Sequence, residues 1–144
     1  RINLMIEIVN KVLLKNPNWT FELYGSGVID DKSLELLNSN PRMFYKGHTD
    51  KPMNVLLSSS INLNTSSFEG FSLSILEASM CGIPTISFNF GESVYEEIIN
   101  DETGYIIEND DVDEYIKKLE FLMNNYEKLS IGKKSQLPVP FMAI

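Results

Sequence analysis

Apolar residues recur every three or four positions near both ends of the chain, as they do in amphipathic helices. The first pattern runs from Ile2 to Leu13, and Pro17 ends it because the residue before a proline avoids the helical region. The second fills the segment "DVDEYIKKLEFLMNN", where Asp111 is the expected N-cap. The sequence therefore predicts a long helix at each end of its patterned part.

Short apolar runs between these two helices predict strands. Five runs have the length and composition of buried strands: "WTFELYG", "RMFYKG", "INLNT", "PTISF" and "TGYIIE". A short helix capped by Asp30 or Asp31 follows the first run, and a helix with Pro52 in its first turn follows the second. Strands that alternate with helices form a parallel sheet with helices on both faces, so we expect an α/β, Rossmann-like fold. Ligands of such sheets bind beyond the carboxyl ends of the strands.

Two further helices are expected in the second half of the chain. The segment "EGFSLSILEASMCGIP", residues 69 to 84, is amphipathic, and Gly82 is its expected left-handed C-terminal residue. The segment "SVYEEIIN" carries a capping-box pattern in Ser93 and Glu96.

Composition narrows the choice of partners and location. The chain has 144 residues, 43% of them hydrophobic, which suits one domain with one core. Its formal net charge of -8 argues against nucleic acid and against a surface held to anionic lipid by charge alone. Cys81 is the single cysteine, so an intrachain disulfide is excluded. With neither a membrane-helix pattern nor a signal peptide, a cytoplasmic location is expected. The helical pattern begins at the second residue without a Met start, so we expect a longer protein.

The strongest chemical signal lies in the segment 69 to 84. The N–H groups of residues 71 to 74 at the helix start favour an anion, and Gly70 lets a ligand approach the backbone. Glu77 lies four residues from both Leu73 and Cys81, so we expect it half-buried in an apolar stripe, where vicinal hydroxyls of a ribose would satisfy its carboxylate. Glu69 beside a diphosphate would be repulsive unless it binds something neutral and hydroxylated, such as a sugar.

Other reactive residues carry weaker signals. His48 is a lone loop histidine, and no second His or Cys stands at metal-ligand spacing, so a zinc site is not predicted. Cys81 is interpreted as a core thiol because no base is placed to activate it. The acidic run "ENDDVDE" lacks the glycine of a calcium-binding loop and is interpreted as a helix cap. For Gly25 and Gly27, spacing alone leaves a simple turn and a ligand-binding loop equally open.

These residues resemble a known family. "EGFSLSILE" followed by "ASMCGIPTI" is similar to the E-x7-E motif of the retaining GT-B glycosyltransferases of family 4. "YGSG", "FYKGH" and "NDETGYIIENDDVDEYIKKL" resemble further landmarks of that family in the same order. The likeness covers residues 1–125 and implies one half of a GT-B fold, the C-terminal, nucleotide-sugar-binding domain without its first strand. Residues 126–144, with Pro138 and Pro140, are left as a C-terminal tail.

The resemblance also implies roles for individual residues. Glu69 would be the catalytic residue at the donor sugar, as nucleophile or as charge stabiliser, and Glu77 would bind the ribose hydroxyls. The following backbone amides would hold the diphosphate and sugar: Gly70, Phe71, Ser72, Leu73 and Ser74. The glycines Gly25 and Gly27 would line the phosphate side. The backbone near Tyr45 and Lys46 would meet the base.

The family's chemistry implies the partners. It transfers a sugar, here of hexosyl type, with retention from a nucleotide-diphosphate sugar, of UDP or GDP type, without an essential metal or other cofactor. The acceptor, a sugar or a lipid-linked molecule of polysaccharide or glycoconjugate biosynthesis, would be bound mainly by an N-terminal domain outside this chain. That domain would also provide any peripheral contact with a membrane.

The chain departs from the family pattern at the diphosphate site, and two other functions stay open as alternatives. The family's diphosphate-binding Arg and Lys would fall before this chain, so we expect residues 1–144 alone to bind donor weakly and to be inactive. A non-catalytic nucleotide-sugar-binding module and one half of a sugar-nucleotide epimerase are the alternatives. A phospho-receiver domain is excluded because its strands must end in aspartates, which these strands lack.

Overall fold

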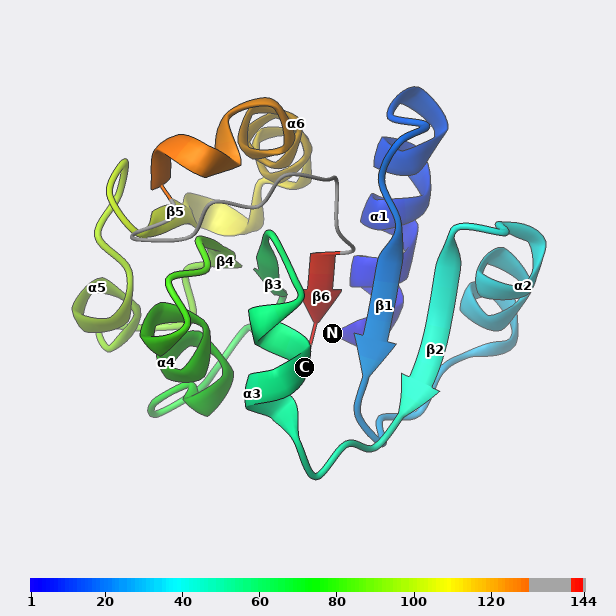
Figure 1. The fold of residues 1–144 in the computed structure, drawn as a ribbon, viewed down its shortest axis with the longest axis horizontal. Coiled ribbons are helices and arrows are strands. Elements are labelled where there is room, and N and C mark those ends of the chain that lie inside the picture. Colours follow the sequence, from blue (N-terminus) through cyan, green and yellow to red (C-terminus); the bar gives the residue numbers. More distant parts are fainter. Residues whose placement is uncertain (130–140, 144) are drawn as a thin grey trace.

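The computed structural model of the chain describes residues 1–129 and 141–143 and shows a parallel sheet covered by helices (Figure 1). The sheet has six strands in the order β2-β1-β6-β3-β4-β5, and every strand pairing is parallel. The strands are β1 (Phe21–Tyr24), β2 (Met43–Gly47), β3 (Asn62–Asn64), β4 (Thr85–Phe88), β5 (Gly104–Ile107) and β6 (Phe141–Ala143). The α/β, Rossmann-like fold predicted from the alternation is confirmed.

The helices lie where the hydrophobic periodicity placed them. They are α1 (Ile2–Lys15), α2 (Asp31–Ser39), α3 (Pro52–Leu57), α4 (Leu73–Met80), α5 (Val94–Glu97) and α6 (Val112–Leu129), with a 3-10 turn η1 (Glu108–Asp110) before α6. Asp30 caps α2 by accepting a hydrogen bond of 2.7 Å from the Ser33 N–H, and Asp111 caps α6 by accepting one of 2.9 Å from the Glu114 N–H. Both predicted caps are therefore confirmed.

Gly82 and Ser93 show one correct and one wrong prediction about helix ends. Gly82 follows α4 with φ +68°, and the next N–H, that of Ile83, donates to the Ala78 carbonyl, which is the predicted left-handed ending. Ser93 makes no side-chain capping bond, because its own backbone is helical and α5 has only four residues. The predicted capping box of Ser93 and Glu96 is therefore wrong.

The two faces of the sheet carry different side chains. Because successive strand residues point to opposite faces, Leu63 and Ile86 face the main core formed with α1 and α6. Their neighbours on the other face, towards α3 and α4, are polar and buried: Asn62, Asn64, Thr85 and Ser87. Two smaller apolar clusters on this side join α3, α4 and α5 to one another. Helices therefore cover both faces, but the centre of one face is polar.

Strand β6 differs from the sequence prediction of five strands followed by a tail. Phe141–Ala143 enters the sheet between β1 and β3 and pairs in parallel with both (Figure 1). The common doubly wound order is 3-2-1-4-5-6, in which the first strand holds this central position. Strand β6 therefore occupies the place of the strand expected before α1. Helix α6 extends past residue 125, and the division of the chain at that residue stays a prediction.

Candidate functional site

A cavity of about 250 Å³ opens at the carboxyl ends of the central strands. It is lined by Arg1, Ile2, Met5, Leu23, Tyr24, Gly25, Ser26, Gly27, Asn64, Thr65 and Ser66. These residues come from the start of α1 and from the ends of β1 and β3. This is the edge, beside the point where the strand order reverses, at which ligands bind open α/β sheets.

The glycines of the predicted site form part of this cavity wall. Gly25 has φ +133°, a conformation that favours glycine, and a Cβ built there would have no atom within 4 Å. A Cβ on Gly27 would come within 3.5 Å of the Ile2 side chain. Both glycines thus stand beside space that a ligand can enter, although their contact with phosphate stays a prediction.

Asn64 braces the loop between β3 and α4. Its Oδ1 accepts a hydrogen bond of 2.7 Å from the Ser66 N–H, and its Nδ2 donates one of 3.3 Å to the Ser72 Oγ. The Ser72 hydroxyl also lies 3.2 Å from the Ser74 hydroxyl. Asn64 is 5% exposed, so one buried side chain fixes both ends of the loop that carries Glu69.

Glu69 lies beside the cavity without lining it. Its carboxylate accepts a hydrogen bond from the hydroxyl of Ser66, which does line the cavity. Gly70 follows with open space where a Cβ would stand, and the side chain of Phe71 is exposed. The structure therefore brings Glu69 and Gly25 to one edge of the sheet through Ser66. The catalytic role of Glu69 stays a prediction.

The backbone amides at the start of α4 divide into two groups. Within the described part of the chain, no acceptor partners the N–H groups of Gly70, Phe71, Leu73 and Ser74. The Ser72 N–H, in contrast, donates to both carboxylate oxygens of Glu97, at 3.0 and 3.2 Å. The prediction that all the amides from Gly70 to Ser74 are open to an anion therefore needs correction at Ser72, whose N–H is occupied in this structure.

Sequence reasoning missed Glu97. The residue stands at the end of α5, 25 positions beyond Ser72, and the local pattern there suggested only a helix cap. Burial raises the pKa of the Glu97 carboxyl, and the nearby charges of Glu69 and Glu96 raise it further, while the bond from the Ser72 N–H lowers it. The start of α4 therefore already holds a carboxylate that is costly to keep charged.

Glu77 is half-buried as predicted, but its surroundings differ from the prediction. Leu73 and Met80 beside it are 69% and 70% exposed, so the expected buried apolar stripe is wrong. The buried residues of α4 are Ser74, Ile75 and Ala78. No described residue donates a hydrogen bond to the Glu77 carboxylate, whose binding of ribose hydroxyls stays a prediction.

The end of β2 reaches the same edge. The Tyr45 hydroxyl donates a hydrogen bond of 2.9 Å to the carbonyl of Gly25, which joins two of the predicted site residues. The Lys46 ammonium instead lies 3.5 Å from the Glu22 carboxylate and over the ring of Phe44. Contact of this segment with a base stays a prediction.

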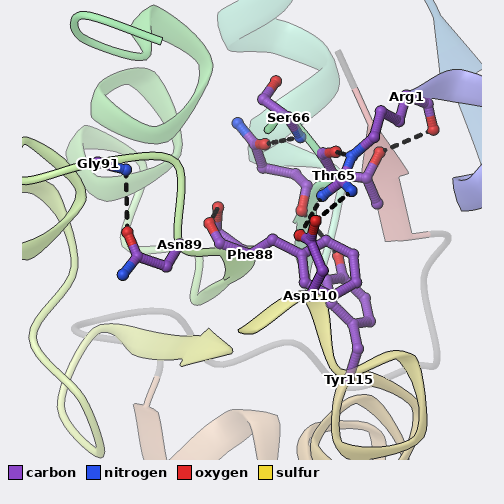
Figure 2. Close-up of polar contacts among 10 residues, drawn as sticks. Arg1, Thr65, Ser66, Phe88, Asn89, Gly91, Asp110 and Tyr115 are labelled. Atoms are coloured by element: carbon purple, nitrogen blue, oxygen red, sulfur yellow. Dashed lines mark hydrogen bonds and ion pairs between the residues drawn. The ribbon is translucent and has the colours of Figure 1, made fainter. Parts of the chain in front are cut away.

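A polar network ties this edge together, and no local sequence signal indicated it (Figure 2). The Arg1 guanidinium donates from Nε to the Thr65 carbonyl at 2.7 Å and forms two hydrogen bonds with the Asp110 carboxylate. Those bonds hold the pKa of Asp110 below its usual range. The buried Tyr115 hydroxyl donates to the carbonyls of Asn64 and Ile86, both at 3.1 Å, so the strand that carries the brace is itself anchored.

The described residues can be searched for a metal site and for a membrane-spanning helix. Among residues 1–129 and 141–143, no group of three or more His, Cys, Asp and Glu residues is placed to hold a metal ion. The half-buried Cys81 thiol lies against Met53. None of the described helices combines the length and apolar character needed to cross a bilayer.

Comparison with known proteins gives consistent matches. Residues 1–135 match the family model of the Glycosyl transferases group 1. The chain is 31% identical over 128 residues to a poly(ribitol-phosphate) alpha-N-acetylglucosaminyltransferase of Staphylococcus aureus, covering 87% of this chain and 26% of that protein. A crystal structure of a mutant of S. aureus TarM with Fondaparinux, alpha-GlcNAc-glycerol and UDP superposes with a TM-score of 0.82 and 30% identity, covering 90% of this chain and 27% of that one.

A second solved structure agrees with the first. The pneumococcal O-GlcNAc transferase GtfA in complex with UDP and GlcNAc gives a TM-score of 0.80 at 25% identity, covering 90% of this chain and 28% of that one. The chain thus spans about a quarter of the length of these three proteins.

Proposed function

The chain belongs to the group 1 glycosyl transferases, and from that premise we propose that it is the donor-binding domain of a GT-B enzyme. The enzyme transfers a hexosyl group from a nucleotide-diphosphate sugar to an acceptor in polysaccharide or glycoconjugate biosynthesis. The names of the relatives support this proposal, since they describe transfer of N-acetylglucosamine and complexes with UDP. UDP is therefore the nucleotide that the proposal favours over GDP.

The observation that carries the proposal is the meeting of three features at one sheet edge. These features are the glycine-walled cavity, the Ser66–Glu69 hydrogen bond, and the amides of Leu73 and Ser74, which have no acceptor among the described residues. In our proposal the amides receive the diphosphate, since a helix start favours negative charge. As the glycosidic bond breaks, charge grows on the leaving diphosphate, and the same amides stabilise it.

The two acidic residues Glu69 and Glu77 bind different parts of the donor in our proposal. Glu69 meets the donor sugar beside the reacting carbon, where a carboxylate stabilises an oxocarbenium-like centre or attacks it. Glu77 accepts hydrogen bonds from the ribose hydroxyls, and the backbone near Tyr45 and Lys46 meets the base. These roles, retention as in family 4, and a reaction without an essential metal are all part of the proposal.

The acceptor side lies outside this chain in our proposal. A second, N-terminal domain binds a sugar or lipid-linked acceptor, closes the cleft and provides any peripheral contact with a membrane; a cytoplasmic location belongs to the same proposal. We therefore expect residues 1–144 alone to be inactive and to bind donor weakly. Transfer by the isolated chain without a partner would contradict this division of roles.

The test is a donor-binding and turnover assay on the full-length protein with UDP- and GDP-sugars. Glu77→Ala is expected to weaken donor binding about tenfold, the loss of about one charged hydrogen-bonded pair. Glu69→Gln is expected to keep binding and to lower turnover at least about a hundredfold. Glu35→Ala on α2, an exposed acid that does not line the cavity, is the control and should change neither.

The outcomes separate the alternatives. Donor binding without any transfer would favour a non-catalytic nucleotide-sugar module. An unchanged affinity in Glu77→Ala would remove the ribose assignment. Failure of every nucleotide-sugar to bind the wild-type protein would refute the proposed function as a whole.

A further inference from the structure

The carboxylate of Glu97 occupies the start of α4, the place where the proposed function puts the donor diphosphate. Both of its oxygens accept from the Ser72 N–H, at 3.0 and 3.2 Å. The position is fixed by packing, because Ile75 of α4 and Val94 of α5 belong to one buried apolar cluster with Ile98. The carboxylate is thus held at the helix start by the fold and not by a flexible loop.

The described charges that act on the Glu97 carboxyl are both negative. Glu69 approaches from the loop before α4, and Glu96 is its neighbour on α5; both disfavour the charge on Glu97. No Lys or Arg among the described residues forms an ion pair with Glu97 or Glu69. The Arg1 guanidinium lines the adjacent cavity but is bonded to the Asp110 carboxylate. A diphosphate that reached the neighbouring amides would therefore add negative charge beside two acids that have no described ion pair of their own.

We propose that donor diphosphate and the charge of Glu97 exclude one another at the start of α4, so that donor binding is accompanied by uptake of one proton on Glu97. The inference rests on the proposed function. The proton comes from solvent and forms an O–H bond on one carboxyl oxygen. The other oxygen still accepts from the Ser72 N–H, and the new O–H can donate to a phosphate oxygen. A repulsive contact thereby becomes a hydrogen bond.

Linkage gives the size of the effect. Where Glu97 is charged in the free protein and neutral in the complex, donor affinity falls about tenfold for each unit of rising pH. Burial and the two neighbouring acids already raise the pKa of Glu97, which brings protonation closer to neutral pH. Glu97 is a donor-binding residue in this proposal, because its charge opposes the diphosphate and its O–H, once formed, can donate to a phosphate oxygen.

The experiment is calorimetric binding of UDP-GlcNAc to the full-length protein between about pH 5.5 and about pH 8, in buffers of different ionisation enthalpy. This donor suits the test because its doubly esterified diphosphate does not titrate in that range. The wild-type protein should bind donor more weakly as pH rises and take up about one proton per donor. Glu97→Gln, which resembles the neutral acid, should bind independently of pH, without proton uptake, and at least about a hundredfold tighter than wild type near pH 8.

Glu96→Gln is the matched control, since its exposed side chain is the adjacent acid on the same helix. It should keep the wild-type pH dependence and proton uptake. Equal pH dependence in wild type and Glu97→Gln, weaker binding by Glu97→Gln, or proton uptake that persists in that variant would each overturn the inference.

The wild-type measurement alone also decides the inference, so it does not depend on the variant folding. Donor binding to wild type without proton uptake at any of these pH values overturns it while leaving the proposed function intact. If neither UDP-GlcNAc nor any other nucleotide-sugar binds to any of the three proteins, the proposed function and this inference are both overturned.

Discussion

The guanidinium of Arg1 donates two hydrogen bonds, of 2.7 and 2.8 Å, to the carboxylate of Asp110, 109 positions away. The same guanidinium donates to the Thr65 carbonyl and lies 4.8 Å above the ring centroid of Phe88 (Figure 2). One side chain at the start of α1 thus joins the ends of β3 and β4 to the turn before α6. These contacts hold one rim of the cavity in place.

Asp110→Asn should lower the free energy of unfolding by about 1 kcal/mol near neutral pH, because two-point binding makes this pair stronger than a typical surface pair. The pKa of Asp110 is lowered in the folded state, so its contribution is present above its unfolded-state pKa. It is lost as pH falls through the folded-state pKa. Urea unfolding at about pH 7 and about pH 3 measures both values, and the difference between wild type and variant should be smaller at the lower pH.

Asp50→Asn is the control for this prediction, since Asp50 is exposed and belongs to no described ion pair. It should leave stability nearly unchanged at both pH values. An effect of Asp110→Asn that is the same at low and neutral pH would mean that the ion pair does not explain it.

Tyr115→Phe should destabilise the fold by about 1–3 kcal/mol. Tyr115 is fully buried, and its hydroxyl donates to the carbonyls of Asn64 and Ile86. Phenylalanine has no hydroxyl, so both carbonyls would lose this hydrogen-bond donor. Ring packing on Phe88, at 4.6 Å between centroids, is kept, so the loss reports the hydroxyl. Chemical denaturation measures it. Tyr95→Phe removes an exposed hydroxyl that donates to Glu108 and should cost clearly less; equal losses would contradict this account.

Local patterns predicted the elements of this fold because their causes are local. Helical spacing marked α1 and α6, and the caps of Asp30 and Asp111 followed from side chains three residues from their partners. The glycines of the cavity wall and Glu69 follow strands of one parallel sheet, whose carboxyl ends meet at one edge, so their common location has a simple topological cause.

The errors arose where distant contacts decide the outcome. Leu73 was expected inside because it is apolar, yet α4 packs on the polar residues Asn62 and Asn64 and leaves Leu73 exposed. The bond between Glu97 and the Ser72 N–H joins two separate helices. Strand β6 has three residues after a proline-rich stretch, too little for periodicity to indicate, and only its partners in the sheet identify it.

Gly104→Ala should destabilise the protein by about 1–3 kcal/mol or more, the usual range for forcing atoms into a packed core. A Cβ at Gly104 would lie 1.9 Å from the Thr85 carbonyl oxygen, a backbone atom that cannot move aside without breaking the pairing of β4 and β5. Thermal unfolding measures the loss. Gly70→Ala, where the Cβ would meet open space, should leave stability nearly unchanged. A stable Gly104→Ala variant would show that the two strands are not packed this closely.

Asn64→Ala should loosen the loop of residues 66–72 more than it destabilises the fold. The substitution removes both bonds of the brace, to the Ser66 N–H and to the Ser72 Oγ, and each such bond contributes about 1 kcal/mol. Hydrogen exchange at the Ser66 and Ser72 amides, the two amides of this loop with a described acceptor, should therefore speed up at least about tenfold, because local opening becomes easier. Donor binding should weaken with it.

Asn62→Ala supplies the matched comparison, because Asn62 is equally buried in β3 but bonds to Thr85 and not to the loop. Its Oδ1 has no partner among the described residues, so its removal should cost less stability. Loop exchange in Asn62→Ala should follow global stability alone. If the loop amides exchange equally fast in the two variants once global stability is subtracted, Asn64 does not brace the segment that carries Glu69, and another contact must hold it against the cavity.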